Sequence, residues 1–238
     1  MTDTIPALLL AVEASTRALS VALFENGRFG DEIFLFDPGR GHAETLLPTL
    51  DGLLSRNGKK PGGLSALAVT RGPGSFTSVR IGLATTLGLA YPRRLPVHAL
   101  STLEILACEI EDRDAWVLPM LDARKGEVYA ALYRPGQPLG EAAFGPLALS
   151  AKDVAESVLE LADGPIVALG DGSLAYAEQL RGVSERLIIP TELQHPHARR
   201  LGERVLARLA QGVPTENAAP LYLRKPEAVV NLEKKKPG

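Results

Sequence analysis

One segment combines a glycine-rich turn with arginines and a serine in a spacing that suits anion binding. The Gly-Pro-Gly turn at residues 72–74 enforces a sharp loop, because proline fixes φ and glycine adopts backbone angles that other residues avoid. Ser75 is a candidate N-cap, and the free N–H groups of the following helix would point at the loop. Arg71 and Arg80 add positive charge. The segment is neither a P-loop nor G-x-G-x-x-G, so it predicts either an anion cradle or an ordinary strand-to-helix turn.

Two carboxylates that follow apolar runs are candidates for metal or phosphate chemistry. Glu13 follows residues 7–12, and Asp122 follows residues 116–121. A carboxylate at the end of a buried strand can hold a hydrated Mg²⁺ beside a phosphate. The alternative is structural: Glu13 accepts hydrogen bonds from the turn at Ser15, and Asp122 supports its own turn. We favour the structural alternative for both.

The histidines and the single cysteine do not form a metal-binding pattern. Leu46 stands four residues after His42, so a helix there presents one imidazole where a metal pair needs ligands at i and i+4. We expect His42 to cap or to pack, and His195 and His197 to lie in a loop without metal. Cys108 has no partner for an internal disulfide, which suits a reducing cytosol, and no catalytic triad stands out.

Composition limits the remaining possibilities. The 238 residues are 45% hydrophobic, which is enough for one large domain or two lobes of about 100 residues each. The formal net charge of −2 argues against gripping nucleic acid by charge alone, so an RNA-related role needs a partner that supplies basic surface. The apolar run at residues 7–12 is too short for a signal peptide or a membrane span. We expect a cytoplasmic protein without membrane association.

The apolar pattern predicts the elements that position these groups. Strands at residues 7–12, 18–24 and 28–36 are followed by a helix over 43–54, a strand at 64–69, a helix over 76–90, a strand at 96–99 and a helix over 101–110. The strand–acidic turn–strand pattern then repeats at residues 116–133, followed by a helix over 151–161, a strand at 166–169 and a last helix over 198–211. This order predicts a two-lobed α/β protein with duplicated βββαβα units.

The predicted domains follow from that repeat. They are an N-terminal lobe of residues 1–110, a C-terminal lobe of residues 111–230, and a disordered tail of residues 231–238. The last helix is expected to pack back on the first lobe. The helix over 76–90 carries an apolar stripe and a second stripe of small residues at Ser78, Gly82 and Thr85, so it can accept another helix at close range. That neighbour is either another part of the chain or a partner subunit.

The duplicated unit, its two acidic turns and its glycine-rich loop resemble the actin/sugar-kinase/Hsp70 ATPase (ASKHA) superfamily. Nearly the whole chain is more closely similar to the TsaB (YeaZ) family. The segments that carry this similarity are Ala11 to Thr16, Ser20 to Leu23, His42 to Pro48, Arg71 to Gly82, Ser101 to Leu103, Leu121 to Tyr129, Gly170 to Gly172 and Pro220 to Arg224.

This resemblance implies a non-catalytic subunit for threonylcarbamoyladenosine synthesis on tRNAs that read codons beginning with adenine. It implies that the chain acts as a scaffold or activator of a TsaD-like transferase, with a TsaE-like ATPase as a further partner. A homodimer is expected when the chain is alone, and tRNA is reached only through the complex. The helix pair of the first lobe would form the interface. Its expected contact residues are His42, Leu46, Leu47, Leu50, Phe76, Val79, Gly82 and Leu83.

The resemblance also implies a degenerate nucleotide site, with weak binding of ATP or ADP and Mg²⁺ there or at a partner interface. Its expected residues are Glu13, Ser15, Asp122, Gly170 and Gly172. The family more often has aspartate at the first of these positions, and the extra methylene displaces the carboxylate. Two alternatives stay open: an ATP-dependent kinase or hydrolase that uses Glu13 and Asp122, and a glycoprotease-like metallopeptidase, which the lone helix histidine disfavours. The Gly-Pro-Gly loop is therefore expected to aim an interface helix.

Overall fold

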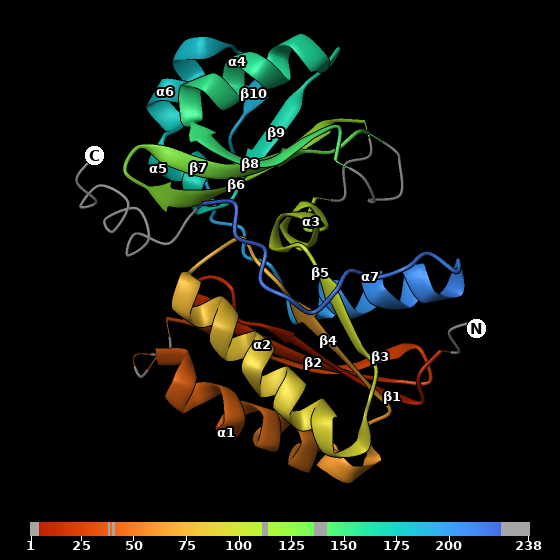
Figure 1. The fold of residues 1–238 in the computed structure, drawn as a ribbon. Helices are drawn as coiled ribbons and strands as arrows, with labels where there is room; N and C mark the ends of the chain where they lie inside the picture. The colour runs from red at the N-terminus through yellow and green to blue at the C-terminus, as the bar shows by residue number, and fades with distance from the viewer. Residues whose placement is uncertain (1–4, 38, 40, 111–113, 136–141, 225–238) are drawn as a thin grey trace, which may run out of the picture.

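Two sheets of the same topology form the two lobes of the protein (Figure 1). The computed structural model describes residues 5–37, 39, 41–110, 114–135 and 142–224. The first sheet has the order β3-β2-β1-β4-β5, and the second has the order β8-β7-β6-β9-β10. In each sheet three antiparallel strands are extended by two strands that run parallel to the first. This repeated order confirms the duplicated α/β fold predicted from the sequence.

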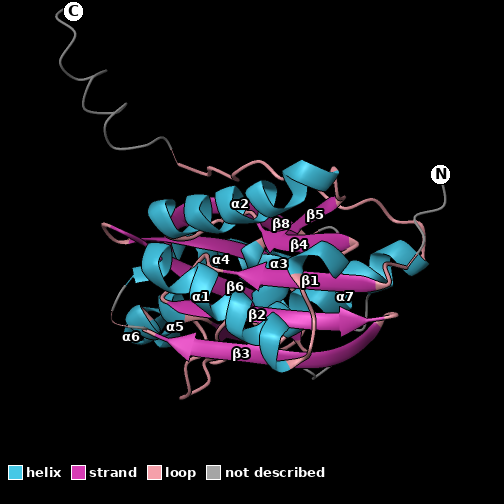
Figure 2. Cartoon of the chain, turned by 90° about the horizontal axis from the view of Figure 1, so that it is seen from below, coloured by secondary structure: helices cyan, strands magenta, loops and turns pink. Residues whose placement is uncertain are grey.

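The first lobe carries helices against one face of its sheet. Its elements are β1 (Leu8–Glu13), β2 (Ala18–Glu25), β3 (Arg28–Phe36), α1 (Gly41–Arg56), η1 (Pro61–Gly63), β4 (Ala66–Thr70), α2 (Phe76–Ala90), η2 (Tyr91–Arg93), β5 (Val97–Leu100) and α3 (Thr102–Ala107). Both β1 and β4 are buried along their full length and are apolar up to their last residues, Glu13 and Thr70, as suits strands covered on both faces. Figure 2 shows α1 and α2 lying in front of this sheet.

The second lobe repeats the plan with shorter helices. Its elements are β6 (Trp116–Arg124), β7 (Glu127–Leu132), β8 (Phe144–Ser150), α4 (Ala151–Leu161), β9 (Ile166–Leu169), α5 (Asp171–Ala175), α6 (Ala177–Val183) and β10 (Leu187–Ile188). Side chains of α4 and α6 fill one face of this sheet. The other face receives Leu103 and Leu106 of α3, so α3 joins the first lobe to the second.

The last helix, α7 (Ala198–Ala210), returns to the first lobe and covers the face of its sheet opposite α1 and α2. Leu201 and Val205 pack there against strand residues that include Phe24. Gly202 makes this close approach possible, because a Cβ at Gly202 would lie 2.0 Å from Cε2 of Phe24. A glycine in a helix interior therefore has a packing reason here.

The segment after α7 runs along both lobes. The backbone of Glu216 bridges to Ala99, and Leu221 N–H donates to the Arg71 carbonyl at 2.8 Å. Arg224 reaches the second lobe, where its Nη1 donates to the Ala123 carbonyl at 3.2 Å. The predicted tail, residues 231–238, lies outside the described residues. Within the part of the chain that the structure describes, no helix has the length and apolar character needed to cross a bilayer.

Candidate functional site

A cleft of about 530 Å³ lies where the equivalent turns of the two lobes face each other. The turn after β1 contributes Ser15 and Arg17, and the β6–β7 hairpin contributes Asp122 and Arg124. The loop before α2 contributes residues 74–76. Of the predicted nucleotide-site residues, the structure therefore brings Ser15 and Asp122 together across one cleft.

Glu13 does not line this cleft, because its carboxylate is turned into the protein. Its side chain is wholly buried and accepts hydrogen bonds from the backbone N–H of Ser15 at 3.1 Å, from Ser15 Oγ at 2.5 Å and from the Thr70 hydroxyl. Burial raises the pKa of Glu13 to about 7, although these donors oppose the rise. A carboxylate that is enclosed by protein donors does not fit a ligand of hydrated Mg²⁺ in the cleft.

The Gly-Pro-Gly loop is attached to the same turn. A Cβ at Gly74 would lie 2.2 Å from the carbonyl oxygen of Ser15, and Ser75 N–H donates to that carbonyl at 2.8 Å. Ser75 then caps α2 by accepting from Ser78 N–H at 3.4 Å, as its position in the sequence predicts. The loop thus fixes the start of α2 against the end of β1.

The two arginines of this segment are held by the C-terminal segment and do not line the cleft. Arg71 forms an ion pair with Glu216 at 2.7 Å. The Arg80 guanidinium lies 3.6 Å from the centroid of the Phe76 ring, and its Nε donates to the Tyr222 hydroxyl at 2.7 Å. Both arginines therefore contact the C-terminal segment, and the expectation that they add positive charge to an anion cradle stays a prediction.

The end of β6 is supported by a residue that was not among the predicted site residues. Asp122 Oδ1 accepts from Arg124 N–H at 2.8 Å, and Asp122 N–H donates to Asp171 Oδ1 at 3.0 Å. Asp171 also lines the cleft. Its signal was present in the sequence, because it is the central residue of the Gly-Asp-Gly triplet at 170–172.

The two glycines of that triplet serve packing and do not line the cleft. A Cβ at Gly170 would lie 2.4 Å from the Met120 carbonyl oxygen, and one at Gly172 would lie 2.9 Å from the Leu121 carbonyl carbon. Gly170 also has a φ of +99°, which favours glycine. Their place in the predicted nucleotide site therefore needs correction, because they let α5 abut the backbone of β6.

The histidines have protein partners. His42 Nε2 lies 3.0 Å from the Ala18 carbonyl oxygen, in the capping and packing role that the sequence suggests. His195 lies against Phe36, with ring centroids 4.8 Å apart, and burial lowers the pKa of His195. Within the described ranges, no cluster of three histidine, cysteine or acidic side chains could hold a metal ion.

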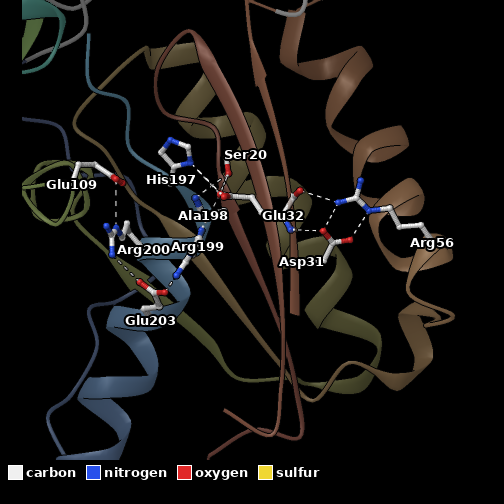
Figure 3. Close-up of polar contacts among 10 residues, drawn as sticks. All are labelled: Ser20, Asp31, Glu32, Arg56, Glu109, His197, Ala198, Arg199, Arg200 and Glu203. Atoms are coloured by element: carbon white, nitrogen blue, oxygen red, sulfur yellow. Dashed lines mark hydrogen bonds and ion pairs between the residues drawn. The ribbon is translucent and has the colours of Figure 1, made fainter. Parts of the chain in front are cut away.

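A polar network fastens the start of α7 to β3 (Figure 3). His197 stacks on Phe34 with centroids 4.5 Å apart, and its Nδ1 lies 3.4 Å from the Glu32 carboxylate, which raises the pKa of His197. Glu32 also accepts from Ser20 Oγ at 2.5 Å and from Arg199 N–H at 3.1 Å. Because its members satisfy one another, this network is structural.

Most residues of the predicted interface belong to the core of their own lobe. The buried ones are His42, Leu46, Leu50, Val79, Gly82 and Leu83. The prediction is wrong for these residues as surface contacts, because helical spacing identifies a shared face without telling whether the chain's own sheet covers it. Gly82 shows the reason directly, since its missing Cβ would lie 3.2 Å from Ala14 Cβ. Leu47 and Phe76 are exposed, and their role in an interface stays a prediction.

The repeated sheet order and the cleft between equivalent turns define a two-lobed α/β protein built from a duplicated unit. The family model described as TsaD, tRNA N6-adenosine threonylcarbamoyltransferase, matches residues 38–232. The chain is 34% identical to the tRNA threonylcarbamoyladenosine biosynthesis protein TsaB of Escherichia coli K12 over 226 residues, covering 91% of this chain and 94% of that protein.

Two further comparisons agree. TsaB of Bacillus subtilis 168 is 30% identical over 222 residues, covering 92% of this chain and 95% of that protein. The solved structure of YeaZ from Pseudomonas aeruginosa is 34% identical, with a TM-score of 0.78, and the match covers 91% of this chain and all of that one. The chain belongs to the TsaB family of tRNA threonylcarbamoyladenosine biosynthesis proteins.

Proposed function

We propose that this protein is a non-catalytic subunit of threonylcarbamoyladenosine synthesis on tRNAs that read codons beginning with adenine. It acts in the cytoplasm as a scaffold or activator of a TsaD-like transferase, and a TsaE-like ATPase joins the same complex. The observation that carries the proposal is an exposed apolar surface on α1 and α2. We call this surface the docking face and define it by Leu47, Phe76 and Leu87, which are 55%, 41% and 42% exposed.

The chemistry of the docking face suits a protein partner. Large apolar side chains that are exposed on two neighbouring helices favour association with another protein, because burying them removes apolar surface from water. Phe76 extends the face onto the C-terminal segment, since its ring lies 5.4 Å from that of Tyr222. The same face supports a homodimer when the transferase is absent. The inward position of Glu13 supports a non-catalytic role for the cleft.

Co-purification with the transferase tests the proposal. Leu47→Glu places a charge on the docking face, and an unpaired charge is costly to bury in an interface. We expect this variant to lose association by at least about a hundredfold in affinity. Leu161→Glu is the matched control, because Leu161 is 50% exposed on α4 of the second lobe. Equal association of both variants with the transferase would contradict the proposed docking face.

A second candidate function is nucleotide binding, because Ser15 and Asp122 face a cleft of about 530 Å³. We propose a weak site there for ATP or ADP, either in this chain alone or completed by the partner. Calorimetry of the isolated protein with Mg–ATP tests it, with Asp122→Asn as the variant. Tight binding and turnover that Asp122→Asn abolishes would favour an ATP-dependent enzyme over a subunit.

A further inference from the structure

The end of the first lobe farthest from the cleft gathers positive charge. The C-terminal ends of α1 and α2 lie together there, and Arg93 after α2 donates to the carbonyls of Pro61 and Gly62 after α1 (Figure 1). The turn between β2 and β3 joins them, since Lys59 forms an ion pair with Glu25 at 2.6 Å. We call this region the basic end. Its cations are Arg28, Arg56, Lys59, Lys60, Arg93 and Arg94, and its acids are Glu25, Asp31 and Asp51.

Part of this charge is not neutralised. Arg56 pairs with Asp31 at 2.5 Å, and Lys59 pairs with Glu25. Arg28, Lys60 and Arg94 are exposed, and none has an ion-pair partner within the part of the chain that the structure describes. An excess of cations at one end is notable in a protein whose net charge is −2. Uncompensated surface cations on separate segments are suited to a partner that carries regularly spaced negative charge.

An aromatic ring lies within this region. Tyr91 begins η2 two residues before Arg93, and it is 84% exposed, more than any other large apolar side chain that the structure describes. An exposed aromatic ring can stack on an unpaired base, while arginine and lysine contact the phosphates. An anionic lipid surface would use the cations but has no base for the ring to stack on.

We infer that the basic end binds the phosphate backbone of RNA, with Tyr91 as a stacking platform. The choice of RNA over other polyanions rests on the proposed function. The inference goes beyond that function, because this chain itself then contacts the tRNA instead of reaching it only through the partner. The basic end continues from the C-terminal end of α2, so it lies beside the docking face and not in the cleft.

Charge reversal on the complex with the transferase tests the inference. The triple variant Arg28→Glu, Lys60→Glu, Arg94→Glu should weaken binding of unmodified tRNA on the order of tenfold or more at low salt, and reduce the slope of log affinity against log salt by about three. The matched control reverses Arg134, Lys152 and Arg181, which are exposed cations of the second lobe. The control should bind tRNA like the wild type, and both triples should keep their folding temperature.

Tyr91→Ser separates stacking from charge. It should weaken tRNA binding about fivefold or more without changing the salt slope. Three results would overturn the inference. The first is an equal loss of tRNA affinity in the two triple variants, and the second is wild-type tRNA affinity in the basic-end triple variant. The third is that the wild-type complex does not bind tRNA. Loss of binding to phosphatidylserine vesicles with unchanged tRNA binding would assign the basic end to lipid instead. If the chain does not associate with the transferase, the proposed function fails. The two triple variants, measured as isolated proteins, then still decide whether the basic end binds tRNA.

Discussion

The turns after β1 and β6 occupy equivalent places in the two lobes but hold their carboxylates in different ways. Glu13 is wholly buried and accepts from Ser15 and Thr70, so its turn is fastened from inside. Asp122 lies at the cleft and accepts from Arg124 N–H at the end of β6. The two lobes therefore share one topology, but only the first turn is a structural anchor for the loop that begins α2.

The largest expected difference between the turns concerns the glycine that touches the first one. Gly74→Ala should lower the free energy of unfolding by about 3 kcal/mol or more, because the new Cβ would lie 2.2 Å from the Ser15 carbonyl oxygen. Chemical denaturation measures this. Gly52→Ala on α1 is the control, since nothing lies within 4 Å of its Cβ position and alanine favours a helix. A tolerated Gly74→Ala would mean that the loop is not fastened to the β1 turn.

The second prediction concerns the ionisation of Glu13. Its pKa is about 7 in the folded protein against an ordinary value of 4.5, so the folded state binds the proton more tightly than the unfolded state. The resulting stability is present below pH 4.5 and is lost as the pH rises through 7. Relative to Glu13→Gln, the wild type should lose about 3 kcal/mol of unfolding free energy between pH 4 and pH 8. If the unfolding free energies of the two proteins changed in parallel with pH, Glu13 would not be enclosed as described.

The smallest effect is expected at the turn of the second lobe. Asp171→Ala removes the acceptor for Asp122 N–H, a bond of 3.0 Å at the edge of the cleft. Water can replace that acceptor, so we expect a loss of about 1 kcal/mol or less. Thermal unfolding would measure it beside Thr70→Val, which removes a buried donor to Glu13 and should cost more. A larger loss of stability in Asp171→Ala than in Thr70→Val would mean that the turn of the second lobe is held more firmly than the turn of the first.

The sequence pattern predicted the positions of long elements, and of elements with one apolar face, well. The helix and strand predicted at 151–161 and 166–169 coincide with α4 and β9, because Ser150 caps the helix and a short apolar run forms the buried strand. The sequence pattern does not indicate α5, α6 and β10, because these elements are too short to show a period. Nor does it indicate β8, whose residues are mostly half-buried and alternate weakly.

The candidate site was predictable only in part. Ser75 as a cap and Glu13 as a buried acceptor follow from residue type and local spacing. The partners of Arg71 and Arg80 do not, because Glu216 and Tyr222 come from a segment more than a hundred residues later in the chain. The burial of Leu50 and Val79 depends in the same way on which face of each helix the sheet covers.

Reconstituted tRNA modification with the purified transferase and ATPase tests the central claim most directly, with Leu47→Glu and Asp122→Asn compared side by side. The proposed docking role predicts that Leu47→Glu reduces the rate at least about tenfold, because the partner no longer associates. Asp122→Asn should leave the rate close to that of the wild type. A full rate with Leu47→Glu and a collapsed rate with Asp122→Asn would contradict the docking role and assign the activity to the cleft.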